Sequence, residues 1–255
     1  MSKPLILVTN DDGINAKGIR SLIEVMNTLG DVIVAAPATV QSGQAHAVTI
    51  HTVLHMDAVK IDDGPQKEYR INGTPVDCVK LSLAHALERK PDLLVSGINH
   101  GSNSSINVLY SGTMGAAIEG GIEGIPSIGF SLASYDHDAD FTAAKHYALQ
   151  IAQSVLKSGL PEGIALNVNV PDLPLAEIKG VKVARQSHDR WEETYDKRVS
   201  PFGKEYYWLK GDFSHNDQGE DTDTYALANN YVAVVPVHFD MTAHQLLDEV
   251  KNIIE

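Results

Sequence analysis

The chain has 255 residues, of which 43% are hydrophobic and 21% charged, as expected for a globular protein able to bury one sizeable core. Its 20 Lys and Arg residues against 33 Asp and Glu residues give a net charge of −13, which repels nucleic acid polymers and requires a site for a small anion to supply its own positive charge. No stretch approaches the roughly 20 apolar residues of a membrane span, no signal-peptide pattern is present, and the one cysteine, Cys78, cannot form an intramolecular disulfide, so we expect a cytoplasmic protein without membrane contact.

The first part of the chain alternates between strand and helix patterns. Continuous apolar runs are typical of strands buried on both faces of a parallel sheet, and apolar residues three or four apart are typical of helices. The runs predict strands at 5–9, 32–36, 48–54, 69–71, 93–95, 125–130 and 164–170, and the helical spacing predicts helices at 19–29, 77–88, 113–121 and 141–156. This alternation predicts a doubly wound, Rossmann-like α/β fold with a mostly parallel sheet.

The character of the sequence changes after about residue 175. Strand-like runs at 181–184, 205–209 and 231–237 are separated by long polar segments without a clear helix, and a helical pattern returns at 242–254. We therefore expect an α/β domain over residues 1–175, followed over residues 176–255 by a β-rich extension and a C-terminal helix. The acidic run 217–223 is interpreted as a mobile, solvated loop rather than a metal site.

Polar side chains follow the buried strands. Asp11 and Asp12 come directly after the first strand, Ser42 lies in the loop after the second, and Asn99 follows the strand at 93–95. The carboxyl ends of parallel strands meet at one edge of a sheet, so these side chains should face one site. Oxygen ligands suit Mg²⁺, Mn²⁺ or Ca²⁺ rather than zinc, and a cation would relieve the repulsion of adjacent carboxylates. The alternative is a polar turn in which Asp12 caps the next helix.

A second candidate is the start of the helix after Tyr110. Ser111, Gly112 and Thr113 would place free backbone amides, two hydroxyls and a glycine at the helix N-terminus, which suits a phosphate. The alternative is an ordinary Ser or Thr N-cap. Asp240 and His244 are four residues apart, which permits a capping or hinge contact. Four histidines lack metal-ligand spacing and are interpreted as structural or exposed: His46, His51, His55 and His100.

At these residues the sequence resembles the SurE family of 5′/3′-nucleotidases. The resemblance runs from the first strand to the last helix. Its motifs are Val-Thr-Asn-Asp-Asp-Gly at 8–13, Ser-Gly at 42–43, Gly-Thr-Pro-Val-Asp-Cys-Val at 73–79, Val-Ser-Gly-Ile-Asn at 95–99, Tyr-Ser-Gly-Thr at 110–113, Asn-Val-Asn-Val-Pro at 167–171 and Asp-Met-Thr-Ala-His at 240–244.

The resemblance implies one divalent metal ion, Mg²⁺ or Mn²⁺ with Ca²⁺ also able to occupy the site, held by four ligands: Asp11, Asp12, Ser42 and Asn99. It implies that Asp11 and Asp12 are the catalytic residues, and that Asn99 and the segment 111–113 contact the phosphate. The implied activity is hydrolysis of nucleoside 5′- and 3′-monophosphates, with polyphosphate shortened from its end in some members. It further implies homodimers formed by exchange of a C-terminal element, which often pair into tetramers.

The mechanism and the function each leave alternatives open. The metal would position or activate an attacking water, or Asp11 or Asp12 would form an aspartyl-phosphate; Gly13 stands where phosphatases of the second kind commonly place another Asp, which favours water. One rival function is a regulatory module that binds a nucleotide without turnover. Another, a dinucleotide-dependent oxidoreductase, lacks the expected Gly-x-Gly-x-x-Gly after the first strand.

Overall fold

A mixed β-sheet forms the centre of the molecule in the computed structural model, which describes residues 3–136 and 138–255. The strands are β1 (Leu5–Thr9), β2 (Asp31–Pro37), β3 (Met56–Val59), β4 (Lys67–Ile71), β5 (Leu93–His100), β6 (Ser127–Leu132), β7 (Ile164–Val170), β8 (Val181–Val183), β9 (Trp191–Val199), β10 (Glu205–Phe213) and β11 (Val232–His238). Nine of them form the sheet in the order β3-β4-β2-β1-β5-β6-β7-β11-β8. β3 is antiparallel to β4 and β11 to β7, whereas the other neighbours are parallel.

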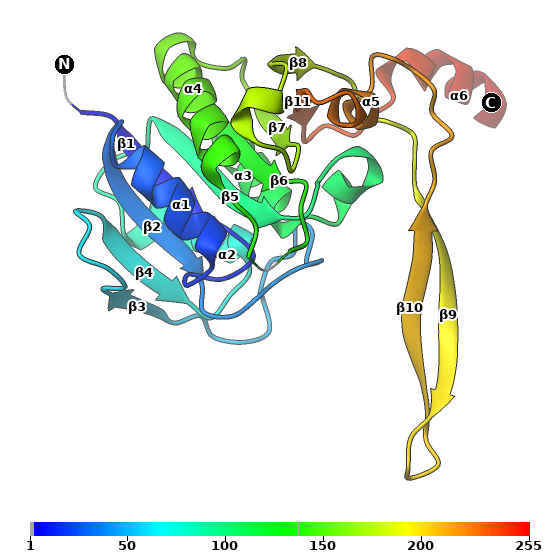
Figure 1. Cartoon of the computed structure of the whole chain (residues 1–255), viewed down its shortest axis with the longest axis horizontal. Coiled ribbons are helices and arrows are strands. Elements are labelled where there is room, and N and C mark those ends of the chain that lie inside the picture. Colours follow the sequence, from blue (N-terminus) through cyan, green and yellow to red (C-terminus); the bar gives the residue numbers. More distant parts are fainter. Residues whose placement is uncertain (1–2, 137) are drawn as a thin grey trace.

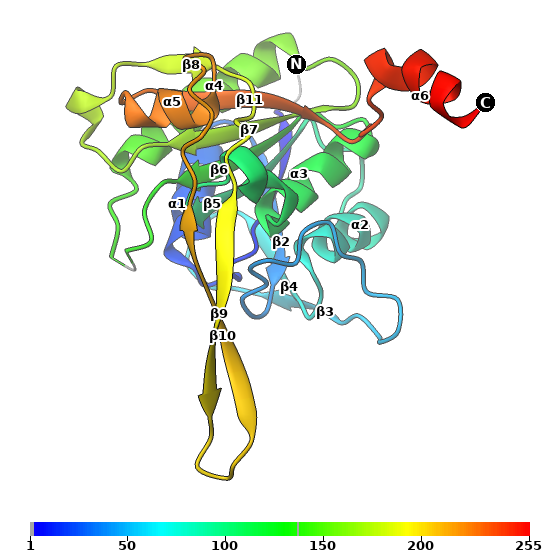
Figure 2. The ribbon, with the colours of Figure 1, turned by 90° about the vertical axis from the view of Figure 1, so that its right-hand side faces the viewer.

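Helices cover both faces of this sheet. The helices of the described residues are α1 (Lys17–Met26), α2 (Pro75–His85), α3 (Gly112–Ile122), α4 (Thr142–Ser158), α5 (Asp223–Ala228) and α6 (Leu247–Ile254), with short 3₁₀ helices η1 (Ser105–Leu109), η2 (Leu175–Glu177) and η3 (His244–Leu246). Figures 1 and 2 show α1 and α4 on one face and α2 and α3 on the other. Among the described residues, no helix is both long and apolar enough to cross a membrane.

The core explains the apolar runs of the strands. Ile6 and Val8 of β1 pack in the cluster that contains α1 and α4, whereas Leu7 packs in the cluster that contains α2 and α3. Successive side chains of a strand point to opposite faces of the sheet, so a strand covered by helices on both sides must be apolar throughout. The doubly wound, mostly parallel fold predicted from the sequence is therefore confirmed.

Some predicted elements are wrong. Residues 48–54 form a loop rather than a strand, with Val48, Ile50 and Val53 exposed, and the strand begins only at Met56. The sequence predicts polar loop where β9 and α5 form. β5 continues to His100, five residues beyond its predicted end, so Asn99 lies within the strand and not in a loop after it.

The chain beyond residue 175 contributes to the same sheet. β11 pairs with β7, and β8 pairs with β11. Figures 1 and 2 show two other segments that leave this body: the hairpin of β9 and β10, and α6. The boundary at residue 175 and an oligomerisation role for residues 176–255 remain predictions.

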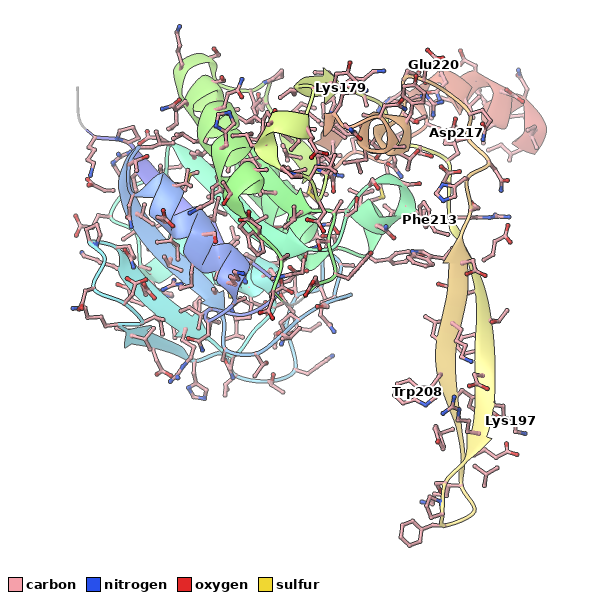
Figure 3. All side chains as sticks on the ribbon, in the orientation of Figure 1. Lys179, Lys197, Trp208, Phe213, Asp217 and Glu220 are labelled. Atoms are coloured by element: carbon pink, nitrogen blue, oxygen red, sulfur yellow. The ribbon has the colours of Figure 1, made fainter. Side chains whose placement is uncertain are left out.

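The hairpin and α6 expose many apolar side chains. Trp208 is 58% exposed and Phe202, at the hairpin tip, is 93% exposed. Figure 3 shows Trp208 and Lys197 standing on the hairpin far from the sheet. On α6, Leu247, Val250 and Ile254 are all exposed. Apolar surface of this extent is typical of an interface.

The acidic run 217–223 is not the solvated loop that the sequence predicts. Asp217 and Asp221 both pair with Arg185, at 2.7 and 3.0 Å. Asp223 is fully buried and accepts hydrogen bonds from the backbone amides of Ser105 (2.8 Å) and Ser187 (3.0 Å). The run therefore joins α5 to the segment before the hairpin, near the position of Asp217 in Figure 3.

Candidate functional site

The ends of β1 and β5 meet at a cluster of polar residues. Thr9 at the end of β1 pairs in register with Ser96 of β5. Beyond these positions, the carboxylate of Asp12 accepts a hydrogen bond from the backbone amide of His100 at 3.3 Å. The two adjacent strands thus bring Asp11, Asp12 and Asn99 to the same edge of the sheet, as the parallel arrangement requires.

Asp11 is buried against the start of α3. Its side chain Oδ1 accepts a hydrogen bond of 2.5 Å from the Thr113 hydroxyl, and the residue is 3% exposed. Burial raises the pKa of Asp11 to about 6; the Thr113 hydrogen bond acts in the opposite direction, and the charge of Asp12 adds to the rise. The fold therefore holds this carboxylate in place at a position that disfavours its negative charge.

Asp12 is the more accessible of the two carboxylates, with 17% of its side chain exposed. It does not cap the following helix, because the N-cap of α1 is Ala16 and no side chain caps that helix. The capping alternative for the Asp-Asp-Gly segment is therefore wrong. The ring Nδ1 of His100 lies 3.7 Å from Asp12 Oδ2, a contact that the sequence analysis did not anticipate.

Asn99 is oriented by its own strand. The register between β5 and β6 shifts between Ser96 and Asn99, and irregularities of this kind re-aim side chains beside sites. The Asn99 side chain Nδ2 donates to the carbonyl of Gly101 at 2.8 Å. The amide nitrogen is thus engaged, and the remaining Oδ1 is the acceptor atom that a hard metal ion would require.

Ser42 comes to this edge through the loop after β2. The backbone amide of Gln41 donates to the carbonyl of Asp11 at 2.7 Å, which ties the loop to the aspartate pair. Ser42 itself is exposed in a turn. Of the four predicted ligands, Asp11, Asp12 and Asn99 are thus connected by the meeting strand ends, and Ser42 is connected through its neighbour.

The start of α3 serves the protein as well as a possible anion. The Ser111 hydroxyl oxygen accepts from the amide of Met114 at 3.0 Å, so the N-cap alternative is correct for this side chain. Its proton remains free to be donated. The Thr113 hydroxyl is already committed to Asp11. The amides of Thr113, Met114 and Gly115 already have acceptors, so an anion at this helix would use the Ser111 proton, the Gly112 amide and the positive end of the helix dipole.

Gly112 makes this approach of α3 to Asp11 possible. A β-carbon at position 112 would lie 2.9 Å from Asp11 Cβ and 3.1 Å from Asp11 Oδ2. Both distances are too short for a real β-carbon to adopt without movement of the aspartate or the helix. The family motif predicts phosphate contact for Gly112, and its packing against Asp11 is a second reason for glycine that depends on where α3 lies.

The donor set fits a hard divalent cation. Two carboxylates, an amide oxygen and a hydroxyl are oxygen ligands of the kind that Mg²⁺ and Mn²⁺ prefer. The raised pKa of Asp11 is a cost that a bound cation would offset. Within residues 3–136 and 138–255, no group of three or more His, Cys, Asp and Glu side chains is arranged to hold a metal ion.

Asp240 and His244 form the contact that their spacing predicted. His244 Nε2 lies 2.7 Å from Asp240 Oδ2. Both residues belong to the segment that joins β11 to α6, at the point where the chain leaves the body of the molecule. Neither η3 nor α6 has a side-chain cap, so the capping interpretation is wrong and the contact fits the hinge interpretation.

Comparison with known proteins shows the family to which the chain belongs. The model of the family described as "Survival protein SurE" matches residues 6–193. The chain belongs to the SurE family. Its SurE relatives include proteins named 5′-nucleotidase SurE from Flavobacterium psychrophilum, 57% identical over 99% of this chain and 98% of that protein, and from Christiangramia forsetii, 59% identical over 98% and 96%. The crystal structure of the SurE protein from Aquifex aeolicus superimposes with a TM-score of 0.85 at 40% identity, covering 99% of this chain and 100% of that one.

Proposed function

We propose that this SurE protein is a 5′-nucleotidase, a phosphoric monoester hydrolase that cleaves nucleoside 5′-monophosphates, and also 3′-monophosphates, to nucleoside and phosphate with one divalent metal ion. The observation that carries the proposal is the meeting of Asp11, Asp12 and Asn99 beside the N-terminus of α3. Relatives at 57% and 59% identity that are named 5′-nucleotidase SurE support the same activity.

One group of residues would bind the metal ion and another the phosphate. Asp11, Asp12, Ser42 and Asn99 would hold the ion, which when bound supplies positive charge to a phosphate oxygen and favours ionisation of an attacking water. The start of α3 would bind the other phosphate oxygens through the Ser111 hydroxyl and the Gly112 amide. In a chain of net charge −13, these two elements provide the local positive potential that a phosphate monoester needs.

We propose that water, rather than an aspartate, attacks the phosphorus atom. Asp11 is 3% exposed and its Oδ1 is engaged by Thr113, so little of this carboxylate is presented to a substrate. Asp12 is more exposed but lies beside His100, and its carboxylate would be engaged as a metal ligand. A phospho-aspartate trapped at either position during turnover would contradict this mechanism.

The nucleotidase proposal is tested by phosphate release from AMP with Mn²⁺ present. Asp11→Asn and Asp12→Asn should each abolish turnover while leaving the circular dichroism spectrum unchanged. Asp172→Asn, at an exposed position outside the site, is a matched control that should retain wild-type rates. Undiminished rates in either site variant, or in excess EDTA, would refute the metal site. Binding of AMP without any phosphate release would instead support the regulatory module, which the named relatives do not favour.

Substrate range and metal identity form a finer part of the proposal. We expect Mg²⁺ or Mn²⁺ as the working ion, with Ca²⁺ able to occupy the same oxygen ligands. A panel of 5′-monophosphates, 3′-monophosphates and polyphosphate, each assayed with Mg²⁺ and with Mn²⁺, decides both questions. Phosphate release from the end of polyphosphate would add exopolyphosphatase activity, and its absence would restrict the enzyme to nucleotides.

We also propose a homodimer formed by exchange of the C-terminal segment, with pairing to a homotetramer through further surface. Leu247, Val250 and Ile254 recur at helical spacing on α6 and are all exposed. A groove of about 860 Å³ lies nearby, lined by residues of α3, β11 and the segment 239–241. The α6 helix of a second copy would cover apolar surface that one chain leaves open.

Light scattering after size exclusion tests the dimer. Wild-type protein should have at least twice the mass of one chain, and the double variant Val250→Glu, Ile254→Glu should have the mass of one chain. Glu249→Gln, on the same helix, is the control and should not change the mass. An unchanged mass in the double variant would refute the exchange.

A cytoplasmic location is the last part of the proposal. Cys78 is buried and unpaired by any disulfide, as is usual for proteins of a reducing compartment. Fractionation of cells that express the protein should place it with cytoplasmic markers, and recovery in an extracytoplasmic fraction would contradict this.

A further inference from the structure

A buried carboxylate on α3 contacts the loop between β2 and β3, residues 38–55, which carries Ser42 and is called the Ser42 loop below. The Glu119 side chain is 4% exposed, and its two oxygens lie 2.7 Å from His46 Nε2 and 2.6 Å from Lys80 Nζ. The hydrogen bond with His46 is the main cause that holds the pKa of Glu119 below its usual value, with Lys80 acting in the same direction and burial in the opposite one. None of these three residues belongs to the candidate metal or phosphate site.

The loop that carries His46 lies directly on α3. A β-carbon at Gly115 would stand 2.3 Å from the carbonyl oxygen of Ala45, so only glycine permits this close approach of the loop backbone to the helix. The amide of Ala45 also donates to the carbonyl of Tyr110 at 3.1 Å. The loop backbone therefore packs against α3, and the His46 side chain adds a contact with the buried carboxylate of Glu119 on the same helix.

Ser42 lies between two anchored points of this loop. On one side, the amide of Gln41 is bonded to the carbonyl of Asp11. On the other side, Ala45 and His46 are held by α3, and the Thr74 hydroxyl donates to the carbonyl of Ala47 at 2.7 Å. The Ser42 side chain is exposed and has no hydrogen bond of its own in the described residues. Its position is therefore set by the anchors of its neighbours.

We propose that His46, through Glu119, is a positioning residue that fixes Ser42 for metal binding. The proposal rests on the assignment of Ser42 as a metal ligand under the proposed function. A side chain that supports a metal ligand from outside typically contributes about 10- to 100-fold in metal affinity. Since Thr74 remains as a second anchor on the same side, we expect a loss of about tenfold when the His46 contact is removed.

The test measures Mn²⁺ affinity by calorimetry and, separately, phosphate release from AMP at saturating Mn²⁺. His46→Ala should weaken Mn²⁺ binding about tenfold while kcat at saturating metal changes little, because the ligand is mispositioned and not removed. His46→Gln should restore the affinity, because the Gln amide nitrogen replaces Nε2 as donor to Glu119. His51→Ala, at an exposed histidine of the same loop, is the control and should match the wild type.

A double-mutant cycle decides whether His46 acts through Ser42. Ser42→Ala alone should weaken Mn²⁺ binding, and adding His46→Ala to it should cause no further loss, because the two changes affect one ligand. If the losses of Mn²⁺ affinity in the two single variants add in the double variant, the positioning role alone is refuted. The same holds if Ser42→Ala weakens Mn²⁺ binding while His46→Ala leaves it unchanged. Wild-type affinity in Ser42→Ala would refute the ligand assignment under the proposed function, and the positioning role with it.

Discussion

The contact of Gly112 with Asp11 makes substitution at this position a sharp test of the site. In Gly112→Ala the new β-carbon would lie 2.9 Å from Asp11 Cβ and 3.2 Å from Pro75 Cγ. Carbon atoms in contact normally sit about 3.5–4.0 Å apart, so an overlap of roughly half an ångström or more must be relieved. Asp11 is buried and bonded to Thr113, so relief requires the carboxylate or the start of α3 to move.

The expected effect is larger on catalysis than on stability. A misplacement near 1 Å in a site can lower the rate about 100-fold, which corresponds to about 2.7 kcal/mol of transition-state stabilisation. Overpacking costs about 1–3 kcal/mol of folding free energy, and replacement of a helical glycine by alanine returns about 0.4–1 kcal/mol. The net loss of stability in Gly112→Ala should therefore lie between about 0 and 2.6 kcal/mol.

The assay compares kcat/KM for AMP with Mn²⁺ and the free energy of unfolding in urea. Gly121→Ala is the matched control, because it lies in the same helix and its new β-carbon would meet no atom closer than 3.4 Å. It should keep wild-type activity. Wild-type kcat/KM in Gly112→Ala would show that the position of Asp11 relative to α3 does not matter for catalysis, and would refute the reasoning.

Three further changes probe the surroundings of the site. Thr113→Val removes the hydroxyl that donates to Asp11 and should lower Mn²⁺ affinity, measured by calorimetry, about 10- to 100-fold. Thr113→Ser keeps the hydroxyl and should retain the wild-type affinity. Equal Mn²⁺ affinities in Thr113→Val and the wild type would contradict the role of this bond. Gly18→Ala would place a β-carbon 1.9 Å from the Ile98 carbonyl oxygen and should cost about 3 kcal/mol or more in urea unfolding; a loss below about 1 kcal/mol would be inconsistent with this packing. The pKa of Glu119 is lowered, so the extra free energy of unfolding of the wild type relative to Glu119→Gln should be fully present above about pH 4.5 and should be lost as the pH falls through the lowered pKa. A difference in unfolding free energy that does not depend on pH would refute the cause given for that shift.

The accuracy of the predicted elements depends on burial. β1 was predicted correctly because it is covered on both faces and carries a continuous apolar run, a pattern that is readable without neighbours. The segment 48–54 shows the limit of the same reasoning. Its apolar residues suggested a strand, yet Ile50 is 78% exposed and Val53 71% exposed, because no neighbouring strand among the described residues pairs with the segment. Apolar spacing indicates only that a segment can form a buried strand. Whether it does so depends on whether the rest of the fold places a neighbouring strand beside it.

The site divides in the same way. Adjacent carboxylates after one predicted strand, and polar residues after two others, indicated an oxygen-ligand site, because the carboxyl ends of parallel strands lie at one edge of a sheet. The contacts of those residues could not be predicted. The Thr113 bond to Asp11 and the fit of Gly112 against the same carboxylate depend on where α3 lies.

The sequence by itself determined the α/β fold, the SurE motifs and the chemical type of each candidate ligand, because these depend on residue identity and local spacing. Only the tertiary structure decided that His46 and Lys80 share the buried Glu119. His46 lies 73 positions from Glu119 and Lys80 lies 39 positions from it, and nothing in their local sequence marks them. The long-range packing of the Ser42 loop and α2 against α3 brings them together, and packing is a property of the whole fold.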